Sequence, residues 1–115
     1  MPRNLPHAER AVVPREKLEG YLLNLGHEGG RHKARVFGAA LGIHRGDWEY
    51  LRDGIVEGVV AAPSARFARR VGSVTVPIEG LNGRTRRVMT VWLVASAGDP
   101  SRFVTGYVVG PPARA

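Results

Sequence analysis

The segment His27–Phe37 reads HEGGRHKARVF and holds the most reactive side chains of this chain. It combines two imidazoles, one primary amine, two guanidinium groups and a Gly-Gly pair. Imidazoles exchange protons near neutral pH, and ammonium and guanidinium groups bind phosphate oxygens. The segment therefore favours phosphate chemistry, with His27 and His32 as acid or base candidates and Lys33 and Arg35 as phosphate-binding candidates.

Lys33 has an unusual position in the helix that this segment predicts. Steps of ~100° per residue put Lys33 near the middle of an apolar stripe, whereas His32 and Arg35 project the other way. A first-turn lysine also meets the positive end of the helix dipole. Two interpretations are equally supported: a cation held for catalysis or anion binding, or a stem lying on apolar surface with its ammonium in water. The stripe consists of Val36, Phe37, Ala40 and Leu41.

The charge of the chain is distributed unevenly. The net charge is +7, and fifteen of the seventeen basic residues are arginine. Residues 1–63 carry nine basic and eight acidic residues, whereas residues 64–115 carry eight and two. Arginine suits bidentate phosphate contacts and stacking on bases, so the basic C-terminal half favours a nucleic acid partner.

Length and composition exclude several classes of protein. At 115 residues the chain fits one domain, which we expect over residues 11–110, with an irregular arm at 1–10 and a flexible tail at 111–115. Without cysteine there is no disulfide framework and no thiolate zinc site. No apolar run approaches a membrane span, and the N-terminus lacks the apolar core of a signal peptide. We expect a cytoplasmic protein without cofactor or membrane contact.

Three helices are predicted in the N-terminal half. The first runs from about Arg15 to Leu23, because Leu18, Tyr21, Leu22 and Leu25 recur at helical spacing. The second runs from about Arg31 to Leu41 and ends at Gly42 in a left-handed cap. Asp47 is the predicted N-cap of the third. Its buried stripe is expected to be Trp48, Leu51, Ile55 and Val59.

An antiparallel sheet is predicted after Pro63, where the apolar period changes from helical to alternating. A linker of about eight residues comes first. Asn82-Gly83 then predicts a two-residue hairpin turn, which places Thr75 opposite Thr90 and Val74 opposite Val91 on the helix-covered face. A second hairpin through residues 98–100 leads to a strand over about 102–109, with Val104 and Val108 on the apolar face. The fold class is α+β: three N-terminal helices packed on one face of a meander of three or four strands.

The uncovered face of this sheet is predicted to display hydroxyls, arginines and aromatic rings. Such a mixture suits RNA, because guanidinium groups take phosphate and rings stack on unpaired bases. An ordinary solvated face rich in β-forming residues is the alternative. The predicted members of the face are Ser73, Thr75, Arg84, Arg86, Thr90, Trp92, Thr105 and Tyr107.

The segments AVVPREKLEGYLLN, GGRHKARVF, DWEYLRD, GLNGRTRRVMTVW and VTGY resemble a bacterial domain family of unassigned name, found alone and at the C-termini of polymorphic toxins. The resemblance spans Ala11 to Tyr107, with the motif GGxxKAxxF, then NGR, then TVW. The order of helices then sheet is also similar to the barnase, EndoU, colicin and RelE group of ribonucleases. The matched positions are Asn24, His27, Gly30, Lys33, Ala34, Phe37, Asn82, Gly83, Arg84, Thr90, Trp92 and Thr105.

This resemblance implies a toxin that cleaves RNA without a metal, by attack of the 2′-hydroxyl on the adjacent phosphate. His27 or His32 would do the acid and base work, and Lys33 and Arg84 would hold the phosphate. Thr90 and Thr105 would hydrogen-bond the substrate. Expected partners are RNA, with tRNA as one candidate, and a small acidic antitoxin or immunity protein. The alternative is a non-catalytic module that binds RNA or a partner within a toxin–antitoxin pair.

Overall fold

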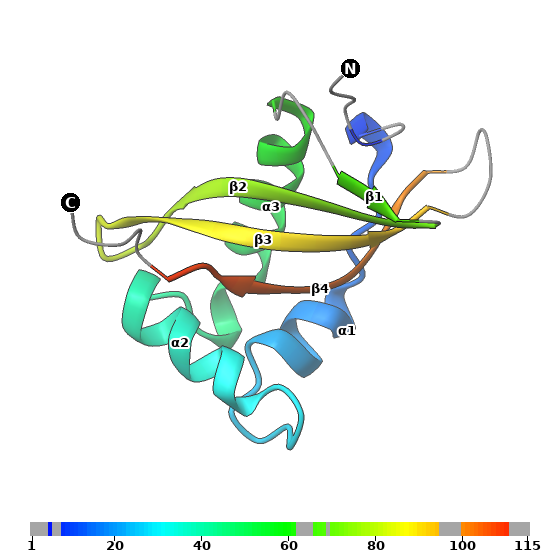
Figure 1. Ribbon diagram of the computed structural model, residues 1–115. Helices are drawn as coiled ribbons and strands as arrows, with labels where there is room; N and C mark the ends of the chain where they lie inside the picture. Colours follow the sequence, from blue (N-terminus) through cyan, green and yellow to red (C-terminus); the bar gives the residue numbers. More distant parts are fainter. Residues whose placement is uncertain (1–4, 6–7, 62–65, 69, 95–99, 111–115) are drawn as a thin grey trace.

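The computed structural model describes residue 5 and residues 8–61, 66–68, 70–94 and 100–110 (Figure 1). Helical segments come first and strands follow, as the predicted fold class requires. The helical segments are a 3-10 turn Ala8–Arg10, α1 Arg15–Lys17 with its π-helical continuation Leu18–Leu22, α2 Arg31–Leu41, and a 3-10 turn Arg45–Asp47 that leads into α3 Trp48–Ala61. The strands are β1 Arg66–Ala68, β2 Val71–Glu79, β3 Thr85–Leu93 and β4 Arg102–Val108.

The second predicted helix is confirmed at both ends. α2 covers Arg31–Leu41, and Gly42 follows with a φ of 66°, the left-handed cap conformation that glycine adopts without strain. The predicted N-cap of the third helix is wrong. Asp47 lies at the end of the 3-10 turn, and its Oδ2 accepts the His44 backbone N–H at 2.9 Å, so the helical segment begins before it.

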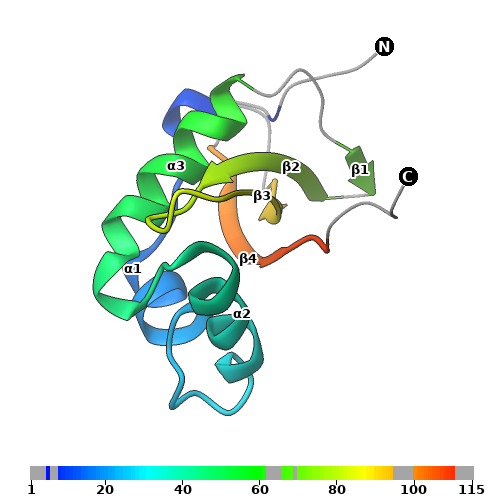
Figure 2. The same ribbon diagram turned by 90° about the vertical axis from the view of Figure 1, so that its left-hand side faces the viewer.

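The strands form one antiparallel sheet in the order β1-β2-β3-β4. α3 lies along β2 on one face, and α2 packs against β4 (Figure 2). We call the face turned away from α3 the open face. Strand β1 lies inside the predicted linker, because three residues are too few to show an alternating pattern. The fully buried core includes Leu18, Leu22, Phe37, Leu41, Leu51, Ile55, Val59, Val76, Val88, Trp92 and Phe103.

The hairpin between β2 and β3 has one loop residue more than predicted. Gly80 N–H donates to the Arg84 carbonyl at 2.6 Å, and Gly83, with a φ of 84°, ends a three-residue loop. This is the alternative hairpin that a glycine in the left-handed region also supports. Contacts with another part of the chain select this longer loop. The backbone N–H and the side-chain amide of Asn82 donate to carbonyls at the end of α2, each at 3.3 Å.

The extra loop residue inverts the predicted faces of β3. Val74 lies opposite Thr90, and Thr75 lies opposite Met89, so the predicted pairs Thr75–Thr90 and Val74–Val91 are wrong. Successive strand residues alternate between faces, and a shift by one exchanges them. Thr90 and Trp92, predicted on the uncovered face, are therefore fully buried. The prediction for β2 is confirmed, since Val74 and Val76 are buried.

Strand β4 contains an irregularity that the alternation did not predict. The register with β3 shifts between Val91 and Trp92, so Val91 pairs with Thr105 and Trp92 with Phe103. Phe103 is thereby buried against Trp92, with ring centroids 5.5 Å apart. The prediction that Val104 faces the core is wrong, because this residue is skipped in the pairing and is 38% exposed.

Three predictions fall wholly or partly on residues outside the described ranges. The turn at Gly98-Asp99 and the tail at 111–115 lie outside them, as does most of the arm at 1–10. Val12 forms an isolated parallel bridge with Arg102.

A buried polar pair in the core generates the first testable prediction. Trp92 Nε1–H donates to Thr90 Oγ1 at 2.8 Å, and this hydroxyl donates to the Val74 carbonyl at 2.6 Å. Thr90→Val keeps the shape of the side chain but leaves the indole N–H without an acceptor. We expect the free energy of unfolding to fall by about 1–3 kcal/mol, measured by urea denaturation. Thr75→Val on the open face is the control, with an expected change within about 0.5 kcal/mol. Equal losses would contradict this role of Thr90.

Candidate functional site

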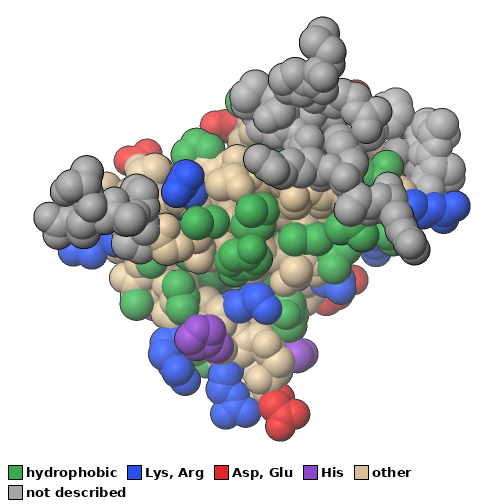
Figure 3. All heavy atoms as spheres, in the orientation of Figure 1, with side chains coloured by type: hydrophobic (Ala, Val, Ile, Leu, Met, Phe, Trp, Pro, Cys, Tyr) green, Lys and Arg blue, Asp and Glu red, His purple; other side chains and the backbone are tan. Residues whose placement is uncertain are grey.

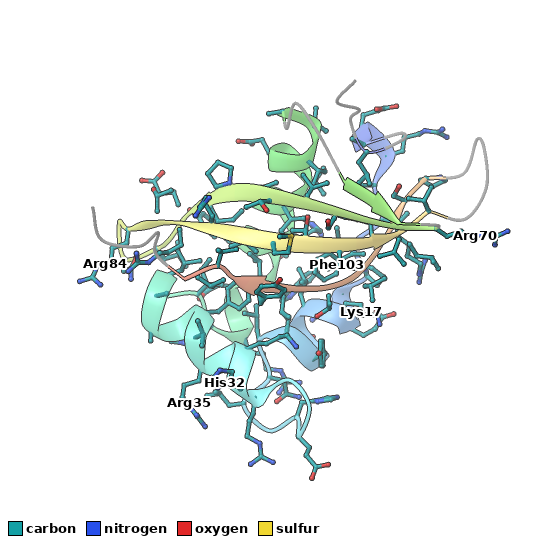
Figure 4. All side chains as sticks on the ribbon, in the orientation of Figure 1. Lys17, His32, Arg35, Arg70, Arg84 and Phe103 are labelled. Atoms are coloured by element: carbon teal, nitrogen blue, oxygen red, sulfur yellow. The ribbon has the colours of Figure 1, made fainter. Side chains whose placement is uncertain are left out.

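A pocket of about 570 Å³ opens where the first helical segment, the loop before α2 and strand β4 meet. α1 and its π-helical continuation supply four lining residues, the loop supplies one, and β4 supplies two. Figure 4 shows Lys17 lying close to β4 at this place. The lining residues are Glu16, Lys17, Gly20, Tyr21, His27, Val104 and Thr105.

Tyr21, which lines this pocket, is contacted by Lys33 from α2. Lys33 Nζ donates a hydrogen bond to Tyr21 Oη at 3.1 Å and lies 5.5 Å from the centroid of the phenol ring. This hydrogen bond lowers the pKa of Tyr21, with a smaller contribution from the Thr105 hydroxyl and from the charges of Lys33 and Lys17, whereas partial burial raises it. The ammonium group of Lys33 thus has a protein partner in the pocket wall, and whether it acts on a ligand stays a prediction.

Thr105 adds a hydroxyl group beside this pair. It lies close enough to lower the pKa of Tyr21. Its oxygen is nevertheless buried and makes no well-formed hydrogen bond within the described part of the chain. Buried polar atoms are ordinarily paired, so the unpaired Thr105 oxygen is a local exception beside Tyr21.

Hydrogen bonds from the loop fix the tautomer of the His27 imidazole. Its Nδ1 accepts the backbone N–H groups of Gly29 and Gly30, both at 3.0 Å. Its ring meets Tyr21 edge-on, with centroids 5.0 Å apart. An imidazole nitrogen that accepts two N–H bonds carries no proton, so this hydrogen-bond pattern assigns the ring proton to Nε2. In this arrangement His27 is a neutral donor through Nε2 and has no nitrogen left to act as a base.

Gly30 explains how Lys33 reaches Tyr21. A Cβ at Gly30 would collide with the Tyr21 carbonyl oxygen, so the first turn of α2 rests directly on the Tyr21 backbone. Lys33 follows three residues later on the same helix and therefore projects over the phenol. The second glycine of the Gly-Gly pair is thus required by close approach of two backbone segments.

The structure gathers three of the predicted site residues at this pocket: His27, Lys33 and Thr105. His32 and Arg35 are exposed and project outward from α2 (Figure 4). Neither lines the pocket. The placement predicted from helical periodicity is confirmed for both.

The remaining predicted site residues lie elsewhere. Arg84 is exposed at the β2–β3 hairpin, far from Lys17 in Figure 4. Arg86 pairs with the buried Ile78 and so belongs to the helix-covered face, which corrects its predicted position on the uncovered one. Thr75 and Tyr107 both pair with Met89 on the open face, as predicted. The prediction that Thr90 and Trp92 contact the substrate is wrong. Both are core residues, and a fully buried side chain cannot touch RNA.

Sequence reasoning missed Glu16, Lys17 and Tyr21. Tyr21 occupies an apolar stripe at helical spacing, and its stripe neighbours Leu18 and Leu22 are indeed buried. The missed signal is local geometry: Leu18–Leu22 adopts a π-helical turn, a conformation that recurs at functional sites. Periodicity assumes a regular helix and does not reveal such a turn.

A second groove of about 620 Å³ lies between α3 and β2. It is somewhat larger than the first pocket, but its charged lining residues are the carboxylates Asp53, Glu57 and Glu79. A negatively charged groove repels a polyanion, so we take the smaller pocket as the candidate site. No group of three or more His, Asp or Glu residues within the described ranges is placed to hold a metal ion. No helix in the same ranges is long and apolar enough to cross a membrane.

Comparisons with known proteins identify a family and a fold. Residues 4–110 match the family described as "Domain of unknown function (DUF6883)". No curated protein matches the chain. A chain of the contact-dependent growth inhibition toxin–immunity protein complex from Klebsiella pneumoniae 342 is similar in structure, with a TM-score of 0.66 and 12% identity over 90% of this chain and 97% of that chain. At this identity the likeness establishes the fold alone.

The contact at Gly30 generates the second prediction. Gly30→Ala pushes the first turn of α2 away from Tyr21 and breaks the bond from Lys33, so the pKa of Tyr21 should rise toward its ordinary value. Ultraviolet titration of the phenols measures this change. The free energy of unfolding should also fall by about 1–3 kcal/mol, as for overpacking elsewhere. Gly29→Ala is the matched control, because its Cβ would lie 3.4 Å from the nearest atom, in ordinary contact. The same rise in pKa in both variants would contradict the role of Gly30.

Proposed function

The chain belongs to the DUF6883 family, whose description assigns no activity, and from its own residues we propose that it is a toxin that cleaves RNA without a metal ion. The observation that carries this proposal is the hydrogen bond from Lys33 to Tyr21 beside a pocket that also holds Lys17 and His27. It puts cations, a phenol of lowered pKa and an N–H donor within one small space.

This inventory fits cleavage by the RNA 2′-hydroxyl. In that reaction the 2′-oxygen attacks the adjacent phosphorus, the bond to the 5′-oxygen breaks, and a cyclic phosphate remains. The negative charge that grows on the phosphorane needs fixed cations and N–H donors, which Lys17, Lys33 and His27 would supply. DNA lacks the 2′-hydroxyl, so the same groups would leave it intact.

The toxin part of the proposal is supported by fold and charge. The structural neighbour comes from a toxin–immunity protein complex, and the net charge of +7 suits a polyanionic substrate. Such a toxin acts in the cytoplasm, where RNA is present, and the cell that makes it needs a neutralising protein. A small acidic immunity protein complements this basic surface.

Lys33→Met is the third prediction. If the ammonium acts at the phosphate, this change leaves the fold intact and lowers RNA cleavage by about 10²-fold or more, the usual effect of losing one transition-state contact. Cleavage of total RNA is measured on gels with and without a chelator, and wild-type cleavage should survive the chelator. Folding is checked by circular dichroism.

Lys33→Arg is the accompanying control. A planar guanidinium fork has a different reach from an ammonium group, so it should not restore cleavage. Arg35→Met removes a neighbouring exposed cation of the same helix and should leave cleavage within about twofold, because exposed charges contribute little. Full cleavage by folded Lys33→Met protein would refute the assignment.

A non-catalytic binding module is the second candidate, and the open face favours it. This face has a strip of apolar side chains that are partly exposed: Val71 at 45%, Leu93 at 43%, Val104 at 38% and Tyr107 at 44%. Figure 3 shows apolar side chains gathered across this face, with basic side chains beside them. Exposed contiguous apolar surface marks interaction sites. A shift of RNA on gels without cleavage would favour this candidate over the enzyme.

The fourth prediction concerns the charge of the open face. Arg87 pairs with Pro77 on this face, whereas its neighbour Arg86 belongs to the other. If the open face binds RNA, Arg87→Ala should reduce the slope of log affinity against log salt by roughly one phosphate contact. Arg86→Ala is the control and should leave the slope unchanged. The reverse result would place the RNA on the helix-covered side of the hairpin.

A further inference from the structure

The proposed reaction needs one group that accepts a proton and one that donates a proton. Four ionisable side chains line the pocket, and Lys33 contacts one of them from α2. Among these groups, the lysines carry no acceptor lone pair while charged, and Nδ1 of His27 is already engaged by two backbone N–H groups. The four lining groups are Glu16, Lys17, Tyr21 and His27.

Glu16 therefore remains as the acceptor, and among the groups that carry a proton we select the Tyr21 hydroxyl, because Lys33 contacts its oxygen at 3.1 Å and can stabilise the phenolate that proton donation leaves. The carboxylate of Glu16 is an acceptor only, and it is exposed at the mouth of the pocket. Tyr21 keeps its own proton available: its oxygen accepts the bond from Lys33 at 3.1 Å, so its O–H is directed to another partner. The neighbouring Thr105 oxygen makes no well-formed hydrogen bond within the described residues, so it does not hold that proton.

We infer that Tyr21 is the proton donor to the leaving 5′-oxygen and that Glu16 accepts the proton of the attacking 2′-hydroxyl. This inference rests on the proposed ribonuclease function. As the 2′-oxygen bonds to phosphorus, its proton passes to the Glu16 carboxylate. As the bond between phosphorus and the 5′-oxygen breaks, the phenol proton passes to that oxygen. The products are a cyclic phosphate and a free 5′-hydroxyl, and the protein retains a protonated Glu16 and a phenolate at Tyr21.

The surroundings of Tyr21 stabilise that phenolate. Lys33 reaches it from α2 and Lys17 from α1, and both lower the pKa of Tyr21. His27 meets its ring from the loop, and Thr105 adjoins its hydroxyl from β4. Glu19, on the same turn as Tyr21, is paired with Arg15 at 2.9 Å. Because the pocket is open to solvent, Glu16 can then release its proton to water, and the Tyr21 phenolate can take up a proton from water.

Tyr21→Phe tests the donor. RNA cleavage should fall by about 10²-fold or more, in the range of general acid catalysis, while binding of an RNA oligonucleotide is retained. Tyr50→Phe, a phenol on α3 that donates to the Glu79 carbonyl, is the matched control and should cleave normally. Glu16→Gln should lower cleavage similarly, whereas Glu57→Gln in the other groove should not.

A modified substrate separates proton donation from mere positioning. An RNA whose 5′-bridging oxygen is replaced by sulfur has a leaving group that departs without a proton. This substrate should restore the rate of Tyr21→Phe to near that of the wild type, but it should not restore Glu16→Gln. Failure to rescue Tyr21→Phe would overturn the donor assignment, and rescue of both variants would overturn the assignment of Glu16.

The pH dependence gives an independent readout. A proton donor must be protonated, so wild-type cleavage should fall as the pH rises through the lowered pKa of Tyr21. Lys33→Met removes the main cause of that lowering and should move the alkaline limb of its residual activity to higher pH. Wild-type protein that cleaves no RNA would overturn the proposed function together with this inference. Wild-type cleavage that Tyr21→Phe keeps in full would overturn the inference alone.

Discussion

The close approach of Gly30 to the Tyr21 carbonyl is the constraint on which the candidate site depends. It lets the first turn of α2 rest on the π-helical turn that carries Tyr21, and it leaves no room for a side chain between them. The two segments also share core packing and are joined by a loop, in which His27 accepts two backbone N–H groups. Because of this contact, an ammonium group and a phenol that lie twelve residues apart share a hydrogen bond.

The sheet contributes to the site by holding its opposite wall. Trp92 and Phe103 belong to the core that the sheet shares with the helices, and Thr90 bonds to Trp92 within the sheet. The register shift in β4 turns Val104 outward, next to Thr105 at the pocket. A regular strand would not place these two successive residues at one pocket, since neighbours on a strand point to opposite faces. The irregularity thus serves the site, as bulges often do.

The pocket at Tyr21 and the groove between α3 and β2 differ in the charge of their lining residues. The pocket at Tyr21 is lined by Lys17 and Glu16, and Lys33 contacts its Tyr21, whereas the charged residues that line the groove between α3 and β2 are three carboxylates. The three carboxylates therefore make the groove between α3 and β2 the less favourable of the two for a phosphate-bearing ligand. The partly exposed apolar strip of the open face lies beside the pocket. Val104 is a member of the strip and also lines the pocket. A partner protein that covered this strip would also reach the entrance of the pocket.

The amino-acid sequence by itself determined the features that depend on near neighbours. The bounds and cap of α2, the outward direction of His32 and Arg35, and the excess of positive charge follow from local periodicity and composition. Tertiary structure decided the faces of β3 and the pairing of Lys33 with Tyr21. The loop at Asn82-Gly83 admits two lengths that differ by one residue, and contacts of Asn82 with the distant end of α2 select between them. Tyr21 fits an apolar stripe in sequence, and only the packing of α2 onto its turn brings a cation to its hydroxyl.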